Sequence, residues 1–172
     1  RFGAKTEYTE VVSVEFSKNI KTVNTQNGVY FSKTVIIATG ADPRKLGIQN
    51  EQDFTGRGVH YCAHCDGRFY KDKTVVVVGG GNSAAADALY LSRLAKKVIL
   101  VHRRDTLRAA KIHHKPLNST DNIELIFDST VSEIIAEKSV SGVIIKNTKD
   151  GHESRIDCDG VFVSIGRRPA TD

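Results

Sequence analysis

The chain has 172 residues, of which 40% are hydrophobic and 26% are charged, and its formal net charge is +5. That length allows one ordinary domain or one domain with a fragment of another, and the composition is typical of a soluble globular protein. No apolar run reaches the ~18–20 residues of a membrane-spanning helix, and no charged-then-apolar leader opens the chain. We therefore expect a cytoplasmic protein with no membrane partner. Because the chain begins at Arg1 and contains no Met, we also expect a piece of a longer protein.

The first 55 residues have the pattern of antiparallel β structure. Alternating apolar residues predict a strand at 12–16, and a second strand-like stretch follows at 21–25. Asn27-Gly28 is the signal of a type I′ hairpin turn, in which both central residues have positive φ. The apolar run at 34–38 predicts a fully buried strand. The breaker-rich connection from Asp42 to Gly58 has the composition of a linker.

The second half of the chain follows a different pattern. The β-branched run 75–78 predicts a parallel strand covered on both faces, and residues 83–94 have helical periodicity. A further buried strand is expected at 98–101, and a third parallel strand at 123–127. Between them we expect a short basic helix that begins at Asp105 and ends at Pro116.

Alternating strands then return at 131–136, 140–147 and 154–157, with Asp150-Gly151 as a hairpin turn, before a last buried strand at 160–166. The pattern predicts an α/β fold: a three-layer Rossmann-like nucleotide-binding domain with an antiparallel β flap, preceded by a β-rich segment.

A glycine-rich turn follows the first parallel strand and opens the helix, and it fits G-x-G-x-x-A. Gly79 permits the tight turn, Gly81 lets the backbone approach a pyrophosphate, and Ala84 allows close contact between helix and strand. Backbone N–H groups at the helix start, around Asn82 and Ser83, then face the phosphates. Glycine turns of this kind also serve packing alone, but the position between strand and helix favours a dinucleotide site.

The residues after the second parallel strand indicate which nucleotide binds. An NAD site has an acidic residue there, whereas this chain has His102, Arg103 and Arg104, with Arg108 shortly after. Guanidinium groups match a 2′-phosphate, so NADPH is favoured over NADH. A solvated basic helix face is the alternative, and we prefer it for the nearby lysines. Nucleic-acid binding by this basic stretch is disfavoured, because no aromatic residue lies between Arg93 and Lys115.

Two of the three cysteines form a C-x-x-C pair, Cys62 and Cys65, just upstream of the nucleotide strand. Thiols at this spacing can close a disulfide within one helical turn, and a helix start lowers the thiolate pKa. Asp66 is placed to move a proton between a departing thiolate and solvent, and His64 adds a tunable charge. The third, Cys158, is expected to be an inert, semi-buried thiol.

Zinc is the competing interpretation of the pair. The two thiolates would need imidazole ligands from His60, His64, His113 or His114 to complete a tetrahedron. No second C-x-x-C exists in the sequence, so we expect no metal site; a purely structural pair is a further alternative.

Taken together, C-A-H-C-D-G, G-G-G-N-S-A, H-R-R-D-x-x-R-A, A-T-G and G-V-F-V-S-I-G resemble the low-molecular-weight thioredoxin reductases, in that order and along essentially the whole chain. The resemblance implies an NADPH-dependent flavoprotein that passes electrons from NADPH through FAD to a Cys62–Cys65 disulfide and on to thioredoxin or a thioredoxin-like protein. It implies that Cys65 lies next to the flavin, that Cys62 attacks the thioredoxin disulfide, and that Asp66 is the acid. It also implies a homodimer in the full-length enzyme.

The resemblance divides the chain into 1–55 as part of the FAD domain, 56–166 as the NADPH-binding domain, and 167–172 as the start of the return to the FAD domain. Thr39 and Gly40 become candidate FAD-domain contacts, and Ile165 and Gly166 candidate cofactor contacts at a hinge. The FAD-binding G-x-G-x-x-G of the family is absent from this chain, as is the Gly-Asp motif after its last strand. We therefore expect NADPH binding without tight FAD binding and without turnover.

Three alternatives remain open. A peroxiredoxin-reductase type of enzyme has the same scaffold but commonly uses NADH, and a small-disulfide oxidoreductase would differ only in its substrate. A non-catalytic NADP- or zinc-binding module would differ in zinc content and in thiol alkylation before and after reduction.

Overall fold

A computed structural model describes residues 3–171, and the described chain divides after Gly40 into two compact units. The division precedes the predicted domain boundary at 55/56, because residues shortly before that boundary pack in the second unit. Phe54 belongs to the core of that unit, and the Asn50 side chain donates a 2.8 Å hydrogen bond to the Ile134 carbonyl. The assignment of residues 1–55 to a FAD domain stays a prediction.

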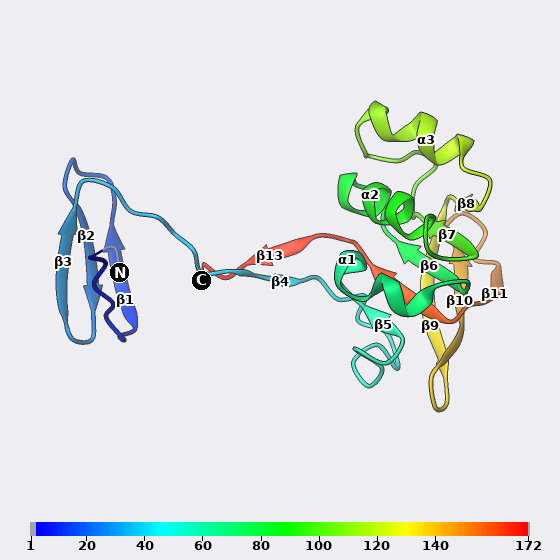
Figure 1. Cartoon of the computed structure of the whole chain (residues 1–172), viewed down its shortest axis with the longest axis horizontal. Helices are drawn as coiled ribbons and strands as arrows, with labels where there is room; N and C mark the ends of the chain where they lie inside the picture. Colours follow the sequence, from blue (N-terminus) through cyan, green and yellow to red (C-terminus); the bar gives the residue numbers. More distant parts are fainter. Residues whose placement is uncertain (1–2, 172) are drawn as a thin grey trace. The chain divides into compact units, whose positions relative to one another are not determined.

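The first unit is a three-stranded antiparallel sheet of β1 (Val11–Glu15), β2 (Lys21–Thr25) and β3 (Gly28–Ser32), in the order β1-β2-β3 (Figure 1). The predicted hairpin joins β2 to β3, but the type I′ prediction is wrong, since neither Asn27 nor Gly28 has a positive φ. The turn is instead held by the Thr25 hydroxyl, which accepts hydrogen bonds from the backbone N–H groups of Asn27 and Gly28.

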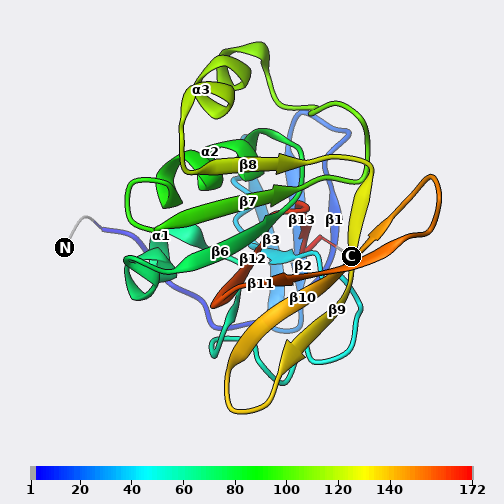
Figure 2. The ribbon, with the colours of Figure 1, turned by 90° about the vertical axis from the view of Figure 1, so that its right-hand side faces the viewer.

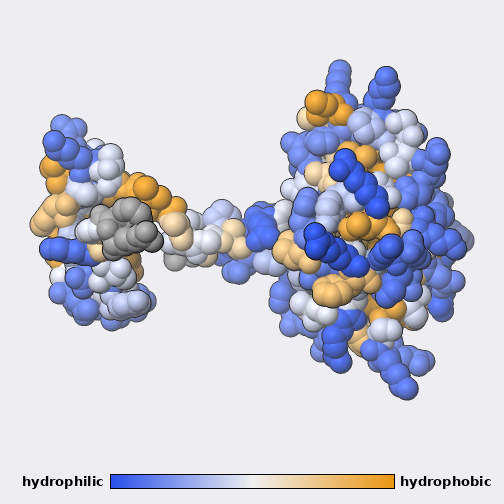
Figure 3. Space-filling view, viewed as in Figure 1, coloured by the Kyte–Doolittle hydropathy of each residue, from blue (hydrophilic) through white to orange (hydrophobic). Residues whose placement is uncertain are grey.

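The strand predicted at 34–38 does not form. The segment has no strand assignment, and Ile36 is 92% exposed. A run of β-branched residues becomes a buried strand only where neighbouring strands pair with it on both sides. Within the described part of the first unit, β1 to β3 pair only with one another. Other apolar side chains of this unit, such as Val12 and Phe31, are also exposed, and Figure 3 shows orange, hydrophobic surface on this unit.

The second unit is built on a five-stranded parallel sheet. Its strands are β5 (Val59–His60), β6 (Thr74–Val78), β7 (Lys97–Val101), β8 (Ile123–Ile126) and β12 (Gly160–Val163), in the order β5-β12-β6-β7-β8 (Figure 2). Every neighbouring pair is parallel. The predicted parallel frame is therefore confirmed.

Helices cover one face of this sheet and the flap covers the other. The helices are α2 (Asn82–Leu91) and α3 (His114–Ser119), and the flap strands are β9 (Ser129–Ala136), β10 (Val140–Asn147) and β11 (Glu153–Asp157). Alternation along β6 serves both layers, because Val75 and Val77 pack in the helix-side core and Val76 and Val78 in the flap-side core. This arrangement confirms the three-layer α/β prediction.

The basic helix predicted from Asp105 to Pro116 is wrong in its extent. Residues 103–110 are not helical, because their backbone is tied to the glycine turn: the N–H groups of Arg108 and Ala109 both donate to the Gly80 carbonyl. A 3₁₀ turn at Lys111–His113 leads into α3. Pro116 lies in the first turn of α3, where no intrahelical partner for an N–H is needed.

Short elements complete the second unit. Helix α1 (Ala63–Asp66) continues into a 3₁₀ turn at Gly67–Tyr70, and β4 (Ala41–Pro43) pairs antiparallel with β13 (Arg167–Pro169). Within residues 3–171, no helix is long and apolar enough to cross a membrane.

Candidate functional site

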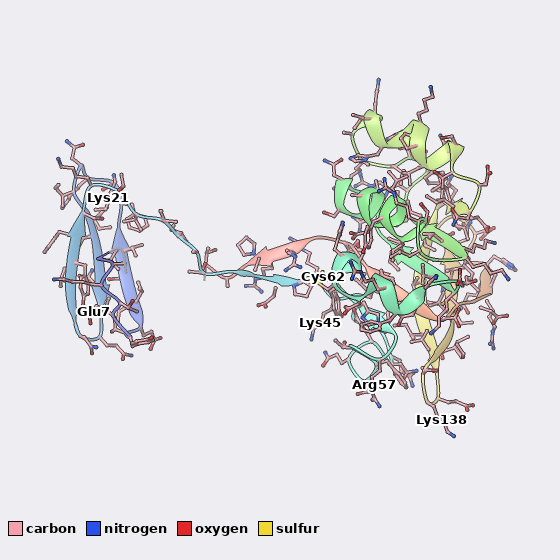
Figure 4. The ribbon with its side chains drawn as sticks, viewed as in Figure 1. Glu7, Lys21, Lys45, Arg57, Cys62 and Lys138 are labelled. Carbon is pink, nitrogen blue, oxygen red and sulfur yellow. A yellow bond between two sulfur atoms is a disulfide. The ribbon has the colours of Figure 1, made fainter. Side chains whose placement is uncertain are left out.

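The C-x-x-C pair lies at the start of α1, directly after β5 (Figure 4). Cys62 and Cys65 form a disulfide, as the spacing predicts. Cys62 occupies the N-cap position of the helix, and the Cys65 backbone N–H donates to Cys62 Sγ at 3.2 Å. Cys62 is half-buried and Cys65 is exposed. A hydrogen-bond donor at Cys62 Sγ favours the thiolate form of that sulfur once the disulfide is opened.

Asp66 is tied to two residues that the sequence analysis did not place beside it. Its Oδ2 atom lies 2.9 Å from Nδ1 of His60, and Nε2 of the same imidazole lies 2.7 Å from the Tyr70 hydroxyl. His60 is the last residue of β5 and is buried, whereas Asp66 is half-buried. The row of carboxylate, imidazole and phenol depends on the folded arrangement of β5 and α1, so spacing in the sequence gave no signal for it.

Tyr61, the residue before Cys62, is held by a second carboxylate, that of Glu51. The Tyr61 hydroxyl donates a 2.8 Å hydrogen bond to Glu51, a buried carboxylate that also accepts from the backbone N–H groups of Leu46 and Gly47. Burial, together with the hydrogen bond to Glu51, raises the pKa of Tyr61 to about 12. The phenol therefore stays neutral and fixes the chain at the entrance to α1.

His64, between the two cysteines, connects α1 to α2. Its ring stacks on Tyr90 with 4.2 Å between ring centroids, and its Nδ1 atom lies 3.9 Å from Oδ1 of Asp87. The other carboxylate oxygen of Asp87 accepts a 2.5 Å hydrogen bond from the Ser164 hydroxyl. The dithiol helix is thus attached to the same helix that the glycine turn opens.

The three glycines of the turn have different surroundings. Gly79 has φ of +150°, and a Cβ there would lie 2.8 Å from Ala84 Cβ and closer still to the Ser164 carbonyl. A Cβ on Gly80 would collide with the His102 ring. Gly81 has no atom within 4 Å of the position that a Cβ would take. Gly79 and Gly80 are required by packing, whereas Gly81 leaves space open in front of the helix start.

A groove with a volume of about 590 Å³ opens above this turn. Most of the predicted nucleotide residues line it: Gly79, Gly81, Asn82, Ser83, His102, Arg103, Arg108, Ile165 and Gly166. Ala84 lies underneath and is buried. Arg104 is not part of the lining, and neither are Thr39 and Gly40, which belong to the first unit.

The groove also contains residues that the sequence analysis missed. Arg44 and Lys45 reach it from the segment after β4, because the Arg44 N–H donates to the Gly166 carbonyl. Ser129, Thr130 and Ser164 contribute hydroxyl groups. No acidic residue of the described part of the chain, 3–171, lines the groove. Its charge therefore comes from Arg44, Lys45, Arg103 and Arg108. Such a groove attracts an anion.

His102 is the buried titratable group of this groove. Burial lowers its pKa, and the charges of Arg108, Arg103 and Arg104 lower it further, against a backbone hydrogen bond that raises it. Its Nε2 atom is buried and has no hydrogen-bond partner among residues 3–171. A neutral imidazole therefore packs under the Gly80 backbone.

The zinc interpretation has no support in this arrangement. The two sulfurs are bonded to each other, and His60 is engaged by Asp66 and Tyr70. No group of three or more His, Cys, Asp and Glu side chains in the described part of the chain is arranged to hold a metal ion. Cys158 is free and buried, and burial raises its pKa to about 12, in agreement with an inert thiol.

Comparison with known proteins places this geometry among disulfide reductases. The family model for pyridine nucleotide-disulphide oxidoreductases matches residues 3–172. The chain is 44% identical to the thioredoxin reductase of Listeria monocytogenes, over 99% of this chain and 54% of the relative. It is 43% identical to that of Streptomyces coelicolor, over 100% of this chain and 54% of the relative. The chain spans about half the length of the curated relatives it matches.

A solved structure gives the same match in three dimensions. The crystal structure of thioredoxin reductase from Streptococcus pyogenes superimposes with a TM-score of 0.80 at 46% sequence identity, covering 95% of this chain and 54% of that chain. The likeness thus includes both the order of the elements and their arrangement.

Proposed function

We propose that this chain, which belongs to the pyridine nucleotide-disulphide oxidoreductase family, is the NADPH-binding and dithiol-bearing part of a thioredoxin reductase. The observation that carries the proposal is the presence, in one compact unit, of a C-x-x-C disulfide and of a groove at a glycine turn whose charged lining residues, among those described, are all basic. The matching relatives are thioredoxin reductases. In the full-length protein, the electron path would run from NADPH through FAD to Cys62–Cys65 and on to thioredoxin.

In the groove, each group has a distinct task. The open space at Gly81 and the helix start at Asn82 and Ser83 receive the pyrophosphate. Arg103 and Arg108 bind the 2′-phosphate by charge-assisted hydrogen bonds. When bound, NADPH supplies a hydride; the protein holds the nucleotide and contributes no redox group of its own in this groove.

At the dithiol, Cys62 attacks the substrate disulfide, Cys65 then displaces the substrate from the mixed disulfide, and Asp66 transfers protons. The N–H group of Cys65 at Cys62 Sγ supports Cys62 as the nucleophile, because it favours the thiolate on that sulfur. In the full-length protein, Cys65 would be the cysteine next to the flavin. His64 holds α1 against α2 through its stack on Tyr90.

FAD does not fit the residues present. A flavin pyrophosphate needs a glycine turn at the start of a helix, and residues 3–40 contain three strands without a helix. We therefore expect this chain to bind NADPH without turnover. In the full-length protein, residues 1–55 and 167–172 belong to the FAD domain and 56–166 form the NADPH domain. We further propose a cytoplasmic homodimer.

Calorimetric titration with NADPH and NADH tests the proposal. Wild-type protein is expected to bind NADPH at least about tenfold more tightly than NADH, since each charge-assisted contact contributes roughly 1.5–3 kcal/mol. Arg103→Ala and Arg108→Ala remove most of this preference. Arg104→Ala has a smaller effect, because Arg104 does not line the groove.

Lys111→Ala is the matched control. It removes a positive charge from an exposed position outside the groove lining, so its effect on either nucleotide is expected to be small. Equal affinity of the wild type for both nucleotides would refute the 2′-phosphate assignment. A preference for NADH would instead favour the peroxiredoxin-reductase type of enzyme.

A further inference from the structure

The groove at the glycine turn crosses the ends of three neighbouring strands. The strands β12, β6 and β7 are adjacent and parallel, so their carboxyl ends lie at one edge of the sheet. The lining contains the residues that directly follow each strand: 164–166 after β12, 79–81 after β6, and 102–103 after β7. Because neighbouring strands lie about 4.8 Å apart, the glycine turn is in the middle of the groove, with the other two segments on either side of it.

The four cations of the lining form two pairs. Arg103 and Arg108 belong to the loop that follows β7. Arg44 instead lies beside the end of β12, because its backbone N–H donates a 3.0 Å hydrogen bond to the Gly166 carbonyl, and Lys45 is the next residue. One basic pair is therefore on each side of the glycine turn.

The main chain at Arg44 is held on both sides, while the side chain is exposed. Before Arg44, strand β4 pairs with β13 in a two-stranded ribbon (Figure 1), and the hydrogen bond to Gly166 follows the last pair of that ribbon. After it, the backbone N–H groups of Leu46 and Gly47 each donate to the Glu51 carboxylate at 2.7 Å. Glu51 is 1% exposed, so this anchor is part of the interior of the unit. The arginine is thus fixed beside the groove at its backbone and free at its guanidinium.

The charges of Arg44 and Lys45 are not neutralised by a neighbouring carboxylate. None of the ion pairs within residues 3–171 includes either side chain. A cationic groove attracts an anionic ligand, and the planar fork of a guanidinium matches two oxygen atoms of a phosphate. Arg44 is therefore suited to bind a phosphate group at the β12 side of the groove.

A dinucleotide has a phosphate for each of these positions. With the 2′-phosphate at Arg103 and Arg108 and the pyrophosphate at Gly81, the nicotinamide half extends toward the end of β12. Of the two pyrophosphate groups, the one on the nicotinamide side is then nearer to Arg44. We propose that Arg44, with Lys45 beside it, binds the nicotinamide-side phosphate of the nucleotide. The inference rests on the proposed function and deepens it, because it adds a contact that NADPH and NADH share.

Calorimetric titration of the whole chain with four ligands tests this assignment. NADPH and NADH both contain the nicotinamide-side phosphate, 2′-phospho-ADP-ribose keeps it without the nicotinamide ring, and adenosine 2′,5′-bisphosphate lacks it. Arg44→Gln removes the charge and keeps the backbone N–H. It is expected to weaken the first three ligands about tenfold each, the effect of one charge-assisted hydrogen bond, and the bisphosphate less than about twofold. The ratio of NADPH to NADH affinity stays at the wild-type value, whereas Arg103→Ala lowers it.

Three further variants separate this contact from a general effect of charge or folding. Arg44→Lys keeps the charge and is expected to retain most of the affinity. Arg93→Gln removes an exposed arginine outside the groove lining and is the matched control, with affinities within about twofold of the wild type. Lys45→Gln keeps the proposal testable if the Arg44 variants fail to fold. It is expected to weaken the same three ligands by about two- to fivefold, as for an exposed charge pair.

The ligand series also determines which results overturn the proposal. Wild-type affinity of Arg44→Gln for NADPH removes the contact altogether. An equal loss for adenosine 2′,5′-bisphosphate places the contact at the adenosine half, and a loss that spares 2′-phospho-ADP-ribose places it at the nicotinamide ring; either result overturns the assignment to the phosphate. In all three cases the wild type still binds NADPH, and the proposed function stands. A wild type that binds none of the four ligands contradicts the proposed function itself.

Discussion

Substitution of the two outer glycines of the glycine turn, Gly79 and Gly81, allows effects on folding and effects on nucleotide binding to be measured separately. Gly79 has φ of +150° and a Cβ position 2.8 Å from Ala84 Cβ, whereas Gly81 has φ of −92° and open space in front of it. We predict that Gly79→Ala destabilises the second unit and that Gly81→Ala mainly weakens nucleotide binding. Both substitutions add the same methyl group to the same turn, so each is the control for the other.

The magnitudes follow from the surroundings. An unfavourable backbone conformation costs roughly 1–3 kcal/mol, and overpacking a close contact costs a similar amount, so Gly79→Ala is expected to lose about 4 kcal/mol of the free energy of unfolding. For a chain of this length that corresponds to a fall of roughly 8–16 °C in Tm. Gly81 is the N-cap residue of α2, where alanine is less favourable than glycine, so Gly81→Ala is expected to lose less than about 1 kcal/mol.

Urea unfolding followed by far-UV circular dichroism measures the first effect, and calorimetric titration with NADPH measures the second. The methyl group that Gly81→Ala adds projects into the groove where the pyrophosphate is expected, and a loss of about 1.4–2.8 kcal/mol of binding free energy weakens Kd by roughly 10- to 100-fold. Wild-type NADPH affinity in Gly81→Ala, or a wild-type urea midpoint in Gly79→Ala, would refute this division of roles.

Two further predictions concern single groups. Because burial raises the pKa of Cys158 to about 12, iodoacetamide at pH 8 is expected to modify only Cys62 and Cys65 of the reduced, folded chain, and to modify Cys158 only in denaturant. Mass spectrometry that shows three modified cysteines without denaturant would contradict this. Burial lowers the pKa of His102 in the folded state, so only the unfolded state gains a proton at this residue as the pH falls below ~6.5, and the free energy of unfolding declines. Urea unfolding at a series of pH values should show a shallower decline for His102→Gln than for the wild type. Identical slopes for the two proteins would contradict this prediction.

Regular periodicity was the part of the fold that the sequence could predict. The continuous valine run of β6 and the alternating residues of the flap are patterns typical of strands, so the sequence predicted these strands in the right order. The C-x-x-C disulfide was predictable because its geometry is local. The glycine turn was predictable because it joins a recognisable strand to a recognisable helix.

The errors share a physical cause, which is dependence on distant partners. The apolar run at 34–38 has the pattern of a buried strand, but burial requires a covering surface, and Ile37 is 60% exposed. Asp105 is a residue type that often caps a helix, but hydrogen bonds from the Arg108 and Ala109 N–H groups to the Gly80 carbonyl keep this segment out of a helix. The contact of His60 with Asp66 and the position of Arg44 at the groove were missed for the same reason, since both depend on tertiary pairing.

Helix α2 connects the proposed nucleotide groove to the dithiol within one unit. Its first residue, Asn82, lines the groove, and Tyr90 near its end stacks on His64 of the C-x-x-C. A rise of about 1.5 Å per residue separates these two points by about 12 Å along the helix. Asp87, between these two points, also accepts a hydrogen bond from Ser164, the residue after β12. Because one compact unit carries both the proposed nucleotide groove and the dithiol, a rotation of that unit turns the two together, which fits the proposal that a flavin outside the unit accepts electrons from one and passes them to the other.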